Sequence, residues 1–84
     1  MLTEGVWAEV KVKGHHLRLF SENNAQGVQV SVYNVTTNSW IAPSEPVDSI
    51  EDGKDRAAEY ARNYLKRTAD IELPSLHWKE ARER

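Results

Sequence analysis

The sequence contains no cysteine among its 84 residues. This absence excludes a disulfide framework, a zinc site built from thiolates and a cysteine nucleophile. The four glycines are scattered along the chain, so there is no glycine-rich loop to hold a phosphate. An excess of one charge is also missing, because 11 Lys and Arg accompany 13 Asp and Glu, for a formal net charge of −2. Neither half is a basic block, which disfavours nonspecific nucleic-acid binding as the main function.

Long apolar runs are absent as well. No run approaches the roughly 18–20 residues of a membrane span, and residues 1–5 lack the basic and apolar regions of a signal peptide. We therefore expect a cytoplasmic protein that does not interact with membranes. The length predicts one small domain over residues 1–78, followed by a frayed tail over 79–84. A chain this short buries only about 60–65% of its unfolded surface, which disfavours a deep enzyme cleft between two lobes.

A tight hairpin is predicted near the N-terminus. Apolar and polar residues alternate over residues 6–12 and again over 15–21, with Lys13-Gly14 between them. Alternation with a period of two indicates strands with one buried face. Glycine adopts positive φ without steric cost, so Lys13-Gly14 is a suitable two-residue loop.

The register of this hairpin follows from the same loop. With Lys13 and Gly14 as the loop residues, Glu9 faces Arg18 and Trp7 faces Phe20 across the two strands. An opposite-charge pair and an aromatic pair are both favourable across strands. A slip of one residue would instead place the leucines of the second strand on the charged face.

Two further strands are expected after the hairpin. Residues 28–35 alternate with valines on one face and predict a third strand, and 40–42 open a short fourth strand. Pro43 and Pro46 either end that fourth strand or mark it as an edge strand, because proline cannot donate a hydrogen bond to a neighbouring strand.

The second half of the chain predicts one long helix at about residues 50–69. Asp48 or Ser49 is the expected N-cap, acidic residues crowd the first turn, and Pro74 prevents continuation. Small residues at helical spacing allow the helix to approach the sheet closely; they are Gly53, Ala57 and Ala61. The predicted fold is therefore α+β: a three- to four-stranded antiparallel meander sheet followed by one long helix packed on one face.

The sheet face away from the helix is the candidate functional surface. It mixes aromatic and charged side chains, and aromatics and arginine are enriched in the centres of protein interfaces. The candidate partner-binding residues are Trp7, Lys11, Arg18, Phe20, Tyr33 and Trp40. We expect a small non-catalytic module that uses this face to bind a protein partner or a second copy of itself. Binding of a second copy would form a homodimer. Alternatively, the C-terminal segment with Leu73, Leu76 and Trp78 folds over this face and covers it.

Other functions have weaker support. The same face, with Lys11, Lys13 and Arg18, would suit an accessory domain that binds nucleic acid, and such binding would weaken steeply with salt. His15 and His16 are adjacent in a strand and point to opposite faces, so they cannot chelate one metal ion in regular geometry. No serine lies in the sequence context of a catalytic nucleophile. We expect no metal, no cofactor and no enzymatic activity.

Overall fold

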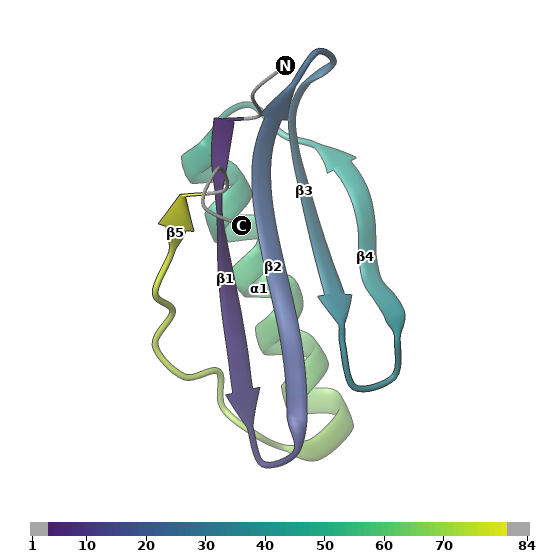
Figure 1. Cartoon of the computed structure of the whole chain (residues 1–84). Coiled ribbons are helices and arrows are strands. Elements are labelled where there is room, and N and C mark those ends of the chain that lie inside the picture. Colours follow the sequence, from purple (N-terminus) through teal and green to yellow (C-terminus); the bar gives the residue numbers. More distant parts are fainter. Residues whose placement is uncertain (1–3, 81–84) are drawn as a thin grey trace.

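The structure, a computed structural model, describes residues 4–80. Its elements are β1 (Glu4–Val12), β2 (His15–Asn24), β3 (Gly27–Asn34), β4 (Ser39–Pro46), α1 (Ile50–Ala69) and β5 (Lys79–Glu80). The strands form one antiparallel sheet in the order β4-β3-β2-β1-β5, and α1 lies across one of its faces (Figure 1). The predicted α+β class and the meander-then-helix order are confirmed, with one strand more than expected.

The first hairpin has the predicted register. Glu9 is opposite Arg18 and Trp7 is opposite Phe20. The loop residues Lys13 and Gly14 have φ values of 46° and 83°. Positive φ at both loop positions matches the right-handed twist of the strands, which explains why two residues suffice to connect them.

The fourth strand is longer than the sequence indicates. β4 continues past Pro43 and ends at Pro46, so the expectation that the strand ends is wrong for Pro43, and the position of β4 at the edge of the sheet matches the edge-strand alternative. An edge strand has one side without a neighbour, so a missing N–H there removes no hydrogen bond. The pairing with β3 is irregular, with register shifts on either side of Val32.

The fifth strand was not predicted. Lys79 and Glu80 form β5 and pair with Trp7 and Val6 of β1, instead of belonging to a frayed end. Two polar residues carry no alternating pattern, so no local signal indicates a strand here. Residues 81–84 lie outside the described part of the chain, and their expected fraying stays a prediction.

The helix begins and ends as the sequence predicts. Ser49 is the N-cap, and its side chain accepts a hydrogen bond from the backbone N–H of Asp52 at 3.1 Å. The helix packs chiefly on β2 and β3. Its buried residues are Gly53, Ala57, Ala61 and Leu65. They meet the apolar face of the sheet, which contributes Ala8, Val10, Leu17, Leu19, Val30, Val32 and Ala42.

The segment after α1 completes this same core. Ile71 is buried, and Leu73, Leu76 and Trp78 pack against the residues between sheet and helix. The segment runs beside β1 toward β5 (Figure 1). Lys54 Nζ of α1 lies 5.8 Å from the centroid of the Trp78 ring. The expected alternative, in which this segment covers the other face of the sheet, is therefore wrong.

Candidate functional site

The face of the sheet opposite α1 carries no helix or strand of residues 4–80 (Figure 1). We call this surface the open face; by register its side chains are those of Trp7, Glu9, Lys11, His16, Arg18, Phe20, Glu22, Gln29, Ser31, Tyr33, Trp40 and Lys79. They alternate along the strands with the buried residues of the core. The register thus places all six candidate residues from the sequence on one surface.

The most exposed apolar group of the open face is Trp40. It is 56% exposed, whereas every other large hydrophobic side chain among the described residues is half-buried or buried. Trp40 on β4 lies opposite Tyr33 on β3, with ring centroids 4.8 Å apart and planes at 69°. This is the edge-to-face geometry that aromatic quadrupoles favour. The Tyr33 hydroxyl also donates a hydrogen bond to Asn38 Oδ1, which fixes the phenol ring against the β3–β4 turn.

A second aromatic pair lies on the β1 side of the open face. Trp7 and Phe20 are opposite each other, and both are half-buried. Lys79 Nζ lies 5.4 Å from the centroid of the Trp7 ring, so a cation already occupies one ring face. Trp7 Nε1 is buried and has no hydrogen-bond partner among residues 4–80. Trp7 is therefore less available to a ligand than Trp40.

Glu9 forms a charged network on β1 and β2, beside the Trp7–Phe20 pair. Its Oε2 lies 2.6 Å from His16 Nε2 and 3.1 Å from Arg18 Nε. The hydrogen bond with His16, together with Arg18, holds the pKa of Glu9 below its usual value, although burial acts in the opposite direction. The Glu9–Arg18 pair was predicted from the sequence, whereas the contact between His16 and Glu9 was not. The predicted register could have indicated this contact, because it makes His16 a diagonal neighbour of Glu9 and long side chains can reach a diagonal neighbour.

This network gives a pH-dependent prediction. Glu9→Gln is expected to lower the free energy of unfolding at pH 7, and its difference from wild type should shrink as the pH falls below about 4.5. A depressed folded-state pKa stabilises the protein above the unfolded-state pKa, and this stabilisation is lost as the pH falls through the folded-state value. Urea unfolding at pH 7 and at pH 2.5 measures it, with Glu59→Gln on the exposed side of α1 as the matched control. A difference that does not change with pH would contradict the network.

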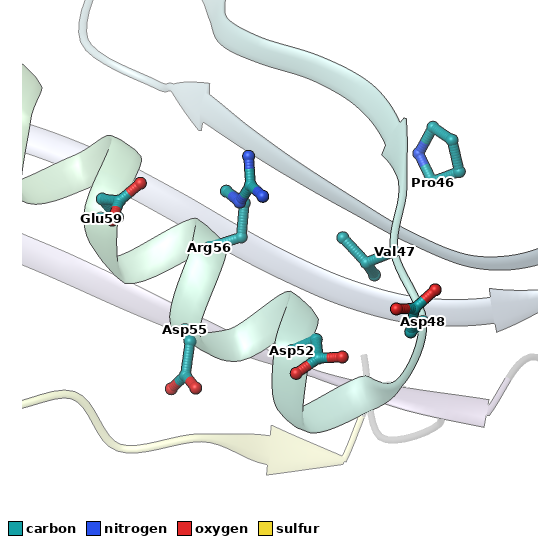
Figure 2. A pocket seen from close by; sticks show the side chains of 7 residues that line it. All are labelled: Pro46, Val47, Asp48, Asp52, Asp55, Arg56 and Glu59. Atoms are coloured by element: carbon teal, nitrogen blue, oxygen red, sulfur yellow. The ribbon is translucent and has the colours of Figure 1, made fainter.

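An acidic depression lies elsewhere, where β4 leads into α1 (Figure 2). It is lined by Pro46, Val47, Asp48, Asp52, Asp55, Arg56 and Glu59. Asp52 lies in the first turn of α1, where the helix dipole favours a carboxylate, and all four carboxylates of the depression are exposed. Arg56 Nη1 lies 3.3 Å from Glu45 Oε2, and the Tyr60 hydroxyl donates to the same carboxylate, which raises the pKa of Tyr60. The depression thus joins the helix start to β4 and has no distinct chemistry of its own.

Among residues 4–80, no group of three or more histidine or acidic side chains is placed to hold a metal ion. None of the helical segments in this range has the length and apolar character that crossing a membrane requires.

Comparisons of the chain with family models, with curated proteins and with solved structures found no match. The fold and the open face define a small α+β domain with one uncovered sheet face. The function is therefore inferred from the chemistry of that face.

Proposed function

We propose that this domain is a non-catalytic protein-interaction module whose open face binds a partner protein. The observation that carries the proposal is the exposed Trp40, held against Tyr33 on a sheet face that no described element covers. Exposed aromatics beside arginine are typical of the few residues that supply most of the binding energy in an interface. A cytoplasmic location stays a prediction from the sequence.

A partner could bind this sheet at an edge, by adding a strand, or on the open face, and the structure of the edges favours the open face. β4 carries Pro43 and Pro46 on one edge, and these residues cannot donate hydrogen bonds to an added strand. At the other edge, β5 already pairs with Val6 and Trp7. A partner that added a strand would meet these prolines at the β4 edge, whereas the open face offers side chains directly.

The arrangement of the rings favours a protein over a nucleic acid. Single-stranded nucleic acid binds platforms on which successive bases stack on aromatic rings. Here Trp7 already contacts Lys79, and Tyr33 packs against Trp40. One exposed ring is left, and Arg18 directs its Nε to Glu9. The open face therefore suits a protein better than a nucleic acid, and the experiment below distinguishes the two ligands.

The test is capture from an extract with immobilised wild-type protein, Trp40→Ala, and Arg62→Ala as a control on the outer side of α1. A captured protein should be lost with Trp40→Ala and retained with Arg62→Ala. Its purified form should then bind wild type at least about 10-fold more tightly than Trp40→Ala. Light scattering measures whether the partner is a second copy, in which case Trp40→Ala would disrupt the dimer.

Two results would contradict the proposal. One is a set of captured proteins that does not depend on Trp40. The other is capture of nuclease-sensitive material whose binding weakens steeply with salt, which would identify a nucleic-acid ligand instead.

A further inference from the structure

The Tyr33–Trp40 pair presents a preformed aromatic surface on the open face. Its rings meet at 69°, and the hydrogen bond from Tyr33 to Asn38 holds one of them in place. Rings that are already fixed lose little entropy when a ligand binds. We infer that this pair binds a proline of an extended, acidic segment of the partner protein, and that Lys11 contacts a carboxylate of the same segment. The inference rests on the proposed function and names the chemistry of the partner.

The Tyr33–Trp40 pair lies on a sheet face, and this position favours a proline-containing segment of the partner over an added β-strand. The backbone groups of the inner strands are paired within the sheet, so the open face offers a ligand mainly side chains. An added β-strand would need an edge, and Pro43 and Pro46 lie in the edge strand next to Trp40. A polyproline II chain keeps its backbone solvated and is already extended before binding, and aromatic surfaces are its usual docking sites.

The charges of the open face explain why the segment is acidic. The carboxylate of Glu9 is already contacted by Arg18 and His16. Lys11 is exposed on the same face, opposite His16. Glu22 lies opposite Gly5, six residues from Lys11 along the strand and thus about 20 Å away. The charge complementary to the Lys11 side of the open face is therefore negative.

The strand register sets the spacing between the two ligand groups. Tyr33 and Trp40 lie in the same row across the sheet as Arg18 and Glu9, and Lys11 lies two residues beyond Glu9. With strands about 4.8 Å apart and about 3.3 Å per residue, Lys11 is about 14 Å from the aromatic pair. A polyproline II chain rises about 3.1 Å per residue. The proline and the carboxylate should therefore be four or five residues apart.

The test uses the blocked peptides Ac-PPAPAPEE-NH2 and, for the opposite chain direction, Ac-EEPAPAPP-NH2, titrated at low salt while tryptophan emission is measured. We expect half-saturation of at least one peptide at about 0.1–1 mM. Trp40→Ala, followed by NMR chemical shifts, should weaken binding at least about 10-fold. Lys11→Gln should weaken it about 2- to 5-fold, as for a surface ion pair, while Arg62→Gln leaves it unchanged.

Matched peptides separate proline recognition from charge. Ac-SSASASEE-NH2 and Ac-PPAPAPKK-NH2 should each bind at least about 5-fold more weakly than the better acidic proline peptide. Equal binding of either control, or no saturation with both acidic proline peptides up to 5 mM (about fivefold above the weakest expected half-saturation), would overturn the inference. Preferential binding of a single-stranded oligothymidylate that depends on Trp40 would overturn it as well.

The two proposals fail in different ways. If the peptides do not bind but a captured protein depends on Trp40, the partner uses another chemistry and only this inference is wrong. If capture does not depend on Trp40 at all, the proposed function is wrong too.

Discussion

Gly53→Ala is expected to lower the free energy of unfolding by about 2–3 kcal/mol, although alanine is the better helix former. Gly53 is buried in the first turn of α1, where it faces β2. A Cβ atom at this position would lie 2.0 Å from Ser21 Oγ and 2.9 Å from Ser21 Cβ. The hydroxyl cannot move away freely, because it donates a 2.8 Å hydrogen bond to the carbonyl of Ile50. The helix would therefore have to move away from the sheet.

The control for this prediction is the same substitution in a Ser21→Gly background. That background removes both atoms closer than 3.0 Å, and the nearest remaining neighbour is Val47 Cγ2 at 3.4 Å. Gly53→Ala should then be neutral or stabilise the protein by up to about 1 kcal/mol, as helix propensity predicts. Urea unfolding of the four proteins of this cycle measures the coupling. A Gly53→Ala protein as stable as wild type would show that the helix does not approach β2 this closely.

The parts of the fold that local chemistry determines could be predicted from the sequence. Lys13-Gly14 supplies the positive φ angles of the loop, and the pairs that follow leave only one register with all leucines buried. Ser49 and the acidic first turn define the start of α1, and Asp70, with φ of 54°, ends it. The small residues of α1 indicated close contact with the sheet, and Gly53 makes it.

The parts that depend on distant contacts could not be predicted. An apolar segment such as residues 71–78 can pack on either face of a sheet, and only the shape of the core beside β1 decides between them. Proline is compatible with an edge strand as well as with the end of a strand, so the sequence did not determine the extent of β4. Lys79 belongs to the open face because β5 pairs with β1, and no local pattern indicates this. The face assignment was predictable, whereas the exposure of each aromatic on it was not.

The most consequential residue that the sequence analysis missed is Asn34. It is 2% exposed, and its Nδ2 donates to the Tyr64 hydroxyl of α1 at 2.7 Å. Its Oδ1 accepts from the backbone N–H of Thr37 at 3.1 Å. Asn34 therefore joins α1 to the β3–β4 turn, which also contains Asn38, the partner of Tyr33. Because Tyr64 is 30 residues away, the pairing has no local signal.

Asn34→Ala is expected to lower the free energy of unfolding by about 2–4 kcal/mol. The substitution removes two hydrogen bonds and leaves a space in a buried position at the end of β3. Tyr64→Phe removes only one of these hydrogen bonds and should cost about 1 kcal/mol. Urea unfolding of both variants and of the double variant should give less than the sum of the two losses, because one hydrogen bond is counted in both.

The same substitution distinguishes a role in stability from a role at the open face. If Asn34 holds the turn that fixes Tyr33, Asn34→Ala should reduce the near-ultraviolet circular dichroism of the Tyr33–Trp40 pair under conditions where the protein is still folded. Tyr64→Phe leaves the bond between Asn34 and Thr37 intact and should keep that signal. Losses that add fully in the double variant would show that Asn34 and Tyr64 do not interact. A stable Asn34→Ala protein with an unchanged signal would mean that the turn keeps the aromatic pair in place without this side chain.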